Sequence, residues 1–175
     1  MRKSIDLESA AVKDVAEFMA AAARTAPKTR GIDNIETIVI DNLSELEKLI
    51  RKMMDLSKKL NRPSMERDAI SIKDSSQVLM IGVKSAALGL NCDFCGYGTC
   101  AALLKSGSVC AFNSIDLGIA VGSAISIAAD FRIDNRVMYS IGKAAIELEF
   151  FSKDVKQALG IPLSVTGKSP YFDRE

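Results

Sequence analysis

Near the start of the chain, apolar and polar positions alternate with the period of a helix. Between residues 7 and 25, Val12, Val15 and Met19 recur three or four positions apart, and charged residues take the opposite side. Pro27 disfavours a helical conformation at the residue before it. The pattern therefore predicts an amphipathic helix that ends at Ala26, followed by a loop.

A strand and a second helix are predicted next. Residues 35–40 (IETIVI) form a β-branched run bounded by turn residues, which is typical of a strand. Ser44 and Glu47 have the spacing of a capping box, so we expect a helix to begin at Ser44. Its apolar residues keep to one face until residues 61–63 (NRP) end it.

Two later segments are almost entirely apolar. Residues 78–83 (VLMIGV) favour a strand covered on both faces, with a buried helix segment as the alternative. Residues 115–129 are apolar on nearly every side, so a helix there must be enclosed by its own domain or by another subunit. Its apolar core, residues 117–129, is shorter than the roughly 20 residues that span a bilayer. We therefore expect no membrane segment.

The last quarter of the chain gives a weaker pattern. Residues 137–141 suggest a strand, residues 152–159 a short helix closed by Gly160, and residues 163–166 a final extended piece. Mixed helices and strands of this kind predict an α+β layer arrangement. The length of 175 residues suits one domain, residues 1–175.

Composition narrows the range of possible functions. Hydrophobic residues make up 48% of the chain and charged ones 26%, as in a globular protein. The net charge of +1 provides no field that would attract a nucleic acid. The chain has no histidine, which excludes Ser-His-Asp triads and HExxH zinc sites. Acidic residues stand where an export signal would be apolar, so we expect a cytoplasmic protein with reduced thiols.

All four cysteines gather in one short loop, residues 91–110. They are spaced as Cys92-x2-Cys95-x4-Cys100-x9-Cys110, and no other cysteine occurs in the chain. Four thiolates are a complete ligand set for tetrahedral zinc or for an iron–sulfur cluster. We predict that these four residues bind metal.

The spacing favours iron–sulfur over zinc. Zinc ribbons use two Cys-x2-Cys pairs, and here only the first pair has that spacing. Four ligands favour a four-iron, four-sulfur (4Fe-4S) cluster, although the order of spacings matches neither the bacterial nor the plant ferredoxin pattern. Zinc stays open as the alternative, as do reduced buried cysteines and two disulfides with three possible pairings.

The residues between the cysteines suit such a site. Gly96 and Gly98 let the backbone bend closely and aim its N–H groups at sulfur. Thr99 can cap a short helix that runs to Gly107. That helix would place Cys100 at its positive end, which favours a thiolate.

Four segments of the chain carry a resemblance: residues 91–100 (NCDFCGYGTC), 113–120 (NSIDLGIA), 23–31 (ARTAPKTRG) and 159–170 (LGIPLSVTGKSP). In these segments the chain resembles a family of uncharacterised prokaryotic proteins described as containing a ferredoxin domain. More distantly, the order of elements resembles nitroreductase-like flavoproteins, with residues 26–28 (APK) after the first helix. The resemblance implies an α+β sandwich of a mixed or antiparallel sheet with helices. It also implies a homodimer with FMN at the subunit interface.

The resemblance to nitroreductase-like flavoproteins implies flavin-binding residues in and beside the loop after the first helix, and one near the end of the chain. These candidates are Arg24, Lys28, Thr29, Arg30 and Lys168. Such side chains can hold the dianionic phosphate of FMN. Lys28 stands where the family has serine, and an exposed basic loop explains the same residues.

We therefore expect an iron–sulfur redox protein of nitroreductase-like fold, with an electron-transfer or reductase role and a redox partner protein. FMN is the second cofactor to test. The rival from another class is a non-enzymatic, zinc-stapled structural or regulatory domain. A third hypothesis is a flavoenzyme whose cysteines are a remnant. No catalytic acid or base is predicted, because none of the 22 acidic residues is marked by its neighbours.

Overall fold

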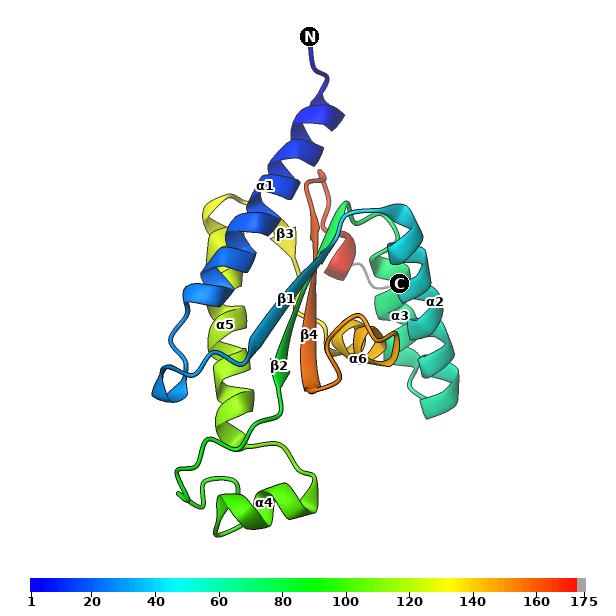
Figure 1. Cartoon of the computed structure of the whole chain (residues 1–175). Helices are drawn as coiled ribbons and strands as arrows, with labels where there is room; N and C mark the ends of the chain where they lie inside the picture. The colour runs from blue at the N-terminus through cyan, green and yellow to red at the C-terminus, as the bar shows by residue number, and fades with distance from the viewer. Residues whose placement is uncertain (173–175) are drawn as a thin grey trace.

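A four-stranded sheet with helices on both faces forms the body of the protein (Figure 1). The computed structural model describes residues 1–172. Along the sheet the order is β1-β2-β4-β3, and every neighbouring pair is antiparallel. The strands are β1 (Ile35–Ile40), β2 (Gln77–Lys84), β3 (Asp134–Asn135) and β4 (Val155–Ser164). The predicted α+β class is confirmed, and the sheet is antiparallel.

The helices divide between the two faces of the sheet (Figure 1). One face carries α1 (Ser4–Thr25) and α5 (Ala111–Asp130), and the other carries α2 (Leu43–Leu60), α3 (Pro63–Ser71) and α6 (Tyr139–Glu147). The short helix α4 (Cys100–Ser106) lies apart, beyond one end of the sheet. Single 3-10 turns, η1 (Thr29–Gly31) and η2 (Pro170–Phe172), follow α1 and β4.

Strand β2 is covered on both faces, as its continuous apolar run predicts. Leu79 and Ile81 join the core under α1 and α5, whereas Val78 and Met80 join the core under α2 and α6. Successive side chains of a strand point to opposite faces, so one uninterrupted apolar segment serves both cores. Of its eight residues, only Lys84 is not fully buried.

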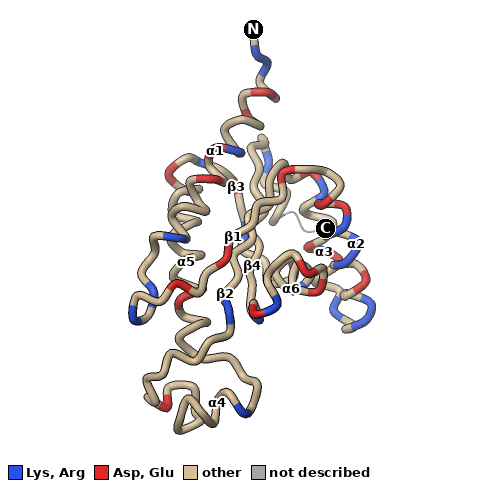
Figure 2. The backbone as a smooth tube through the Cα atoms, viewed as in Figure 1, with Lys and Arg blue, Asp and Glu red and all other residues tan. Residues whose placement is uncertain are grey.

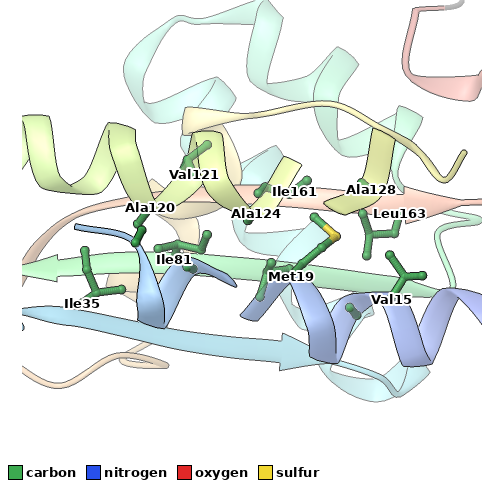
Figure 3. Close-up of a cluster of buried hydrophobic side chains, with 14 of the residues drawn as sticks. Val15, Met19, Ile35, Ile81, Ala120, Val121, Ala124, Ala128, Ile161 and Leu163 are labelled. Atoms are coloured by element: carbon green, nitrogen blue, oxygen red, sulfur yellow. The ribbon is translucent and has the colours of Figure 1, made fainter. Parts of the chain in front are cut away.

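Small residues let α5 lie close to α1 and the sheet (Figure 3). Ala120 and Ala124 of α5 are fully buried beside Met19 of α1 and Ile81 of β2. Burying a methionine side chain of this kind contributes roughly 1.5–3 kcal/mol to folding. The first predicted helix and the apolar helix of residues 115–129 are both confirmed.

The other side of α5 is left uncovered. Ile115 and Ile119 are 39% and 41% exposed, and no other part of residues 1–172 comes within 4 Å of a Cβ built on Gly118 or Gly122. By length and composition α5 could span a membrane, a test that the core helices of soluble proteins also pass. Its contacts with α1 and the sheet are those of a core helix with one free face.

The second helix begins and ends differently from the prediction. Asn42, not Ser44, is its N-cap: the Asn42 side chain accepts a hydrogen bond of 3.0 Å from the backbone N–H of Glu45. Pro63 does end the helical pattern of α2, but it is also the first residue of α3, a helix that was not predicted from the sequence. Proline suits the first turn of a helix because no intrahelical partner exists there for an N–H group.

Two predictions in the last quarter are wrong. Residues 137–141 are not a strand, because α6 begins at Tyr139, and residues 152–159 are not a helix, because β4 runs from Val155 to Ser164. Gly160 looked like a helix terminator but lies in the middle of β4. A Cβ there would come 2.0 Å from Cγ2 of Ile141, so the glycine allows α6 to pack directly on the strand.

Candidate metal centre and basic loop

Residues 85–110, here called the cysteine lobe, leave the end of β2 and return to the start of α5 (Figure 1). The lobe contains α4 and carries two charged residues, Asp93 and Lys105. In Figure 2 it contrasts with the body of the protein, where charged residues are spread over the helices. Its surface is therefore nearly uncharged.

All four cysteines line the same small cavity of this lobe. Cys92 is exposed, Cys95 and Cys100 are half-buried, and Cys110 is buried. All four are free thiols, so the structure contains neither of the two disulfides considered as an alternative. The cavity has a volume of about 10 Å³, the room of a single water molecule. Within residues 1–172, no three Cys, Asp or Glu side chains are placed to hold one metal ion.

Helix α4 presents Cys100 as predicted. Thr99 is its N-cap and accepts a hydrogen bond of 3.2 Å from the N–H of Ala102, and the helix ends at Gly107, whose φ is 70°. Cys100 is thus the first helical residue, next to N–H groups of the first turn that have no intrahelical partner. Cys110 lies beyond the helix and is the N-cap of α5.

A reciprocal pair of hydrogen bonds joins Asn91 to Cys100. The backbone N–H of Asn91 donates to Sγ of Cys100 over 3.4 Å, and the N–H of Cys100 donates to Oδ1 of Asn91 over 2.9 Å. Asn91 adopts a positive φ of 45°, which asparagine tolerates better than most residues. The sequence analysis did not assign this role, and the signal for it was an asparagine directly before the first cysteine.

The two glycines of the loop bend the chain but do not donate to sulfur. Gly96 and Gly98 have φ values of 79° and 69°, as their predicted role requires. Their N–H groups donate instead to Asp93: Gly96 to its backbone oxygen over 2.8 Å, and Gly98 to its Oδ1 over 2.5 Å. The prediction that these N–H groups point at sulfur is wrong, because a turn directs the N–H of Gly96 to the backbone oxygen of Asp93 and the carboxylate of the same residue accepts from Gly98.

Apolar side chains surround the sulfur atoms. Leu88, Leu103 and Cys110 form a small core of their own, separate from the two cores of the sheet. Phe94 stacks on Phe112 with ring centroids 5.3 Å apart, yet remains 63% exposed. The lobe thus combines a dry interior with an exposed apolar surface.

A tyrosine ties the cysteine loop to the far end of α4. The hydroxyl of Tyr97 lies 2.5 Å from Oγ of Ser108, and hydrogen bonds with Ser108 and Ser106 lower the pKa of Tyr97. Tyr97 lies between Cys95 and Cys100 in sequence, so this contact anchors the middle of the loop.

The basic residues at the end of α1 and in the turn after it, residues 24–30, here called the basic loop, lie together, and the structure gives each a partner inside the chain. Arg24 donates to Oδ2 of Asp33 over 2.5 Å and to the backbone oxygen of Ile35 over 2.7 Å. Partial burial is the largest single influence on the pKa of Asp33 and acts to raise it. The hydrogen bonds from Arg24 and from the N–H of Ile35, with the charges of Arg24 and Lys28, together outweigh burial and hold that pKa below its usual value. Arg30 donates to the backbone oxygen of Leu88 over 2.5 Å, which joins this loop to the cysteine lobe.

Lys28 and Thr29 are also engaged. Nζ of Lys28 donates to the backbone oxygens of Ala23 and Arg24 at the end of α1. Burial is the largest influence on the pKa of Lys28 and lowers it. The N–H and Oγ1 of Thr29 both donate to Oδ1 of Asp116, over 3.0 and 2.8 Å. Asp116 lies on α5 and is 2% exposed, and the sequence analysis did not single it out.

Lys168 lies far from these four residues within one chain. The basic loop precedes Ile35, which pairs with Val83 of β2, whereas Lys168 follows the end of β4, where Leu163 pairs with Gln77. Val83 and Gln77 are six residues apart on β2, about 20 Å at the rise of a strand. The five predicted flavin contacts therefore do not converge on one site in a single chain.

Sequence comparison gives the family. Residues 106–174 match the family described as "Uncharacterized protein containing a ferredoxin domain". An uncharacterised protein of Archaeoglobus fulgidus is 43% identical, and the match covers 97% of this chain and 95% of that protein. The chain belongs to this ferredoxin-domain family. The matched segment includes Cys110, and the other three cysteines precede it.

Solved structures give the fold of this ferredoxin-domain protein. It is similar to a nitroreductase with bound FMN from Desulfitobacterium hafniense, with a TM-score of 0.63 and 14% identity, over 99% of this chain and 85% of that one. It is also similar to a BluB-like flavoprotein from Clostridium difficile, with a TM-score of 0.58 and 15% identity, over 87% and 80%. The nitroreductase-like fold implied by the order of elements is confirmed.

Proposed function

We propose that this protein is a redox protein whose cysteine lobe holds an iron–sulfur cluster, with Cys92, Cys95, Cys100 and Cys110 as its ligands. The observation that carries the proposal is that all four cysteines line one cavity. The family's description and the nitroreductase-like fold both support a redox role. A bound cluster supplies single-electron transfer.

The surroundings of the thiols suit this ligand set. Cys100 is the first residue of α4, and the N–H of Asn91 already donates to its sulfur. A protein sets the reduction potential of a cluster through hydrogen bonds to its sulfurs and through the exclusion of water. Leu88, Leu103 and Phe112 provide the exclusion of water.

A cluster is larger than the present cavity, so binding requires the loop of residues 92–98 to move outward and Tyr97 to exchange its hydrogen bond with Ser108. Three observations support such a movement. Cys92 is exposed, the Phe94 ring is mostly exposed, and no other part of residues 1–172 lies within 4 Å of a Cβ built on Gly96 or Gly98. Cys110 lies in the small core and would remain in place.

Zinc is the second candidate, and the spacing of the cysteines weighs against it. Zinc ribbons use two Cys-x2-Cys pairs, and here only Cys92 and Cys95 have that spacing. One zinc ion needs all its sulfurs about 2.3 Å from a single centre, whereas in a cube of four irons each thiolate binds a different iron. The spacing therefore favours the cube.

FMN and a homodimer form the second part of the proposal. Because Lys168 and the basic loop lie at opposite ends of the sheet in one chain, a single phosphate can meet both only if two subunits supply them. The uncovered face of α5, with Ile115 and Ile119, is the surface that we assign to the dimer. Arg24, Lys28, Thr29 and Arg30 would contribute to FMN binding only after exchanging some of their present hydrogen bonds.

The optical spectrum of anaerobically purified protein tests the cofactor directly. We expect a brown protein that dithionite bleaches. Aromatic side chains do not absorb visible light, so the colour reports the cofactor directly. A yellow protein without the brown component would indicate flavin alone. A colourless protein with bound zinc would contradict the proposal and support the zinc-stapled domain.

A further inference from the structure

A second hollow lies beside the cysteine lobe, and nothing described so far uses it. This groove has a volume of about 470 Å³ and lies between the start of α5, the outer side of α6 and the first half of β4. Leu117, Ala158 and Leu159 are among its apolar lining residues. The volume is within the range of small-molecule sites in proteins, roughly 300–1,000 Å³.

Close packing of α6 on β4 shapes this groove. A Cβ on Gly142 would lie 1.8 Å from the backbone oxygen of Ala158, so only glycine allows the helix to sit on the strand at this point. From the opposite wall, Oγ of Ser114 donates to Oε1 of Gln157 over 2.7 Å. The groove is therefore built on regular elements of the sheet body, which makes it a rigid site.

The rim of the groove combines one aromatic ring with two cations. Tyr139 is 44% exposed, and its hydroxyl receives a hydrogen bond of 3.4 Å from Arg62. Lys143 and Lys156 are exposed, and no ion pair or hydrogen bond joins either ammonium group to residues 1–172. Glu147 is the one carboxylate among the residues that line the groove. The lining thus offers a ring face and an excess of positive charge.

The groove and the cysteine cavity share the first turns of α5. Ala111 and Phe112 line the cavity, and Ser114 and Leu117 line the groove. A helix rises 1.5 Å per residue, so Phe112 and Ser114 are separated by about 3 Å along the helix axis, and they point to different sides of it. A molecule in the groove would therefore contact the same end of α5 that borders the proposed cluster site.

We propose that this groove binds a flat aromatic molecule carrying a carboxylate or a phosphate. Its ring stacks against Tyr139 over the apolar floor, and its anionic group meets Lys143 and Lys156. That this molecule is the small-molecule redox partner of the protein rests on the function proposed above. The binding itself does not, because it needs only the groove.

Calorimetric titration of the anaerobically purified protein tests the binding, with naphthoate, naphthyl phosphate and neutral naphthamide as probes. We expect saturable binding of at least one anion and at least tenfold weaker binding of naphthamide. The double variant Lys143→Ala/Lys156→Ala should lose about tenfold or more in affinity for that anion. Tyr139→Ala should lose about three- to tenfold.

The matched control is Lys58→Ala/Lys59→Ala, which removes the same charge from the exposed end of α2. It should bind the anion like the unaltered protein. Absence of anion binding, or equal affinity in the two double variants, overturns the inference. The spectrum of the same sample reports the cluster separately, so failure of the groove and failure of the proposed function give different results.

Discussion

At the scale of single residues, Asp116 fixes the basic loop to the body of the protein. Its Oδ1 accepts two hydrogen bonds from Thr29, and α5 holds it almost fully buried. Because Thr29 adjoins Arg30, which in turn reaches the backbone of Leu88, this carboxylate also positions the contact between the loop and the cysteine lobe.

Replacing Asp116 with Ala should therefore lower the free energy of unfolding by about 1–3 kcal/mol, because the partly buried N–H of Thr29 loses its acceptor. Urea denaturation measures this change. Asp130→Ala removes an exposed carboxylate from the same helix and should change the value by less than about 0.5 kcal/mol. Equal effects of the two substitutions would show that Asp116 has no anchoring role.

Tyr171 should make stability depend on alkaline pH. Burial raises its pKa above the ordinary value, and its hydroxyl lies 3.0 Å from Oγ of Ser75. The folded state thus binds the phenolic proton more tightly than the unfolded state does. The protonated hydroxyl therefore contributes fully to the free energy of unfolding below about pH 10, and this contribution is lost as the pH rises through the raised pKa.

The unfolding free energy of the unaltered protein, minus that of Tyr171→Phe, should therefore shrink as the pH rises above about 10. Urea titrations of both proteins between about pH 8 and pH 11 measure this difference, in which the thiols and lysines cancel. Tyr139→Phe, on an exposed tyrosine, is the control and should show no such trend. A difference that stays constant over this range would contradict the burial argument.

Candidate site residues could be predicted where the sequence contains an unusual pattern. Four cysteines in one short segment led to the proposed metal site without a structure. The helix cap at Thr99 was also predicted, and the structure confirms it. The roles of Asn91 and Asp116 depend on partners that only the folded chain brings close. Asp116 lies 87 positions from Thr29, and no local pattern encodes such a contact.

At the scale of elements, α6 packs on β4 at a distance that only a glycine allows. Gly142→Ala would place a methyl group against the backbone of Ala158, which cannot move without disturbing the centre of the sheet. We expect a loss of about 3 kcal/mol, the upper end of the usual cost of overpacking. Thermal and urea unfolding measure it.

Lys143→Ala is the matched control, since it alters the next residue of α6 on its exposed side. It should change the unfolding free energy by less than about 0.5 kcal/mol. A Gly142→Ala protein as stable as this control would show that α6 does not lie on β4 as described.

The same contact explains why the end of the chain was mispredicted. Strongly patterned elements such as α1, β1 and β2 followed from periodicity, because each has one clear burial pattern. In residues 152–160, Ser152 and Gly160 imitate the two caps of a short helix. This segment forms a strand because it pairs with β2 and because Ile141 covers it. Both are tertiary contacts, which cannot be predicted from the local sequence pattern.

At the scale of the whole molecule, the uncovered face of α5 predicts self-association. Ile119→Glu places a charge in the middle of that face and should convert a dimer to a monomer, as measured by light scattering on a sizing column. Ile70→Glu, on a half-exposed isoleucine of α3, should leave the dimer intact. A monomeric unaltered protein at micromolar concentration would contradict the dimer.

Metal content tests the central claim most directly. Iron, acid-labile sulfide and zinc are measured per chain in anaerobically purified protein, alongside Cys100→Ser. The account predicts about four irons and four sulfides in the unaltered chain, and a large loss of both in the variant. One zinc per chain without iron, or iron content unchanged by Cys100→Ser, would contradict it.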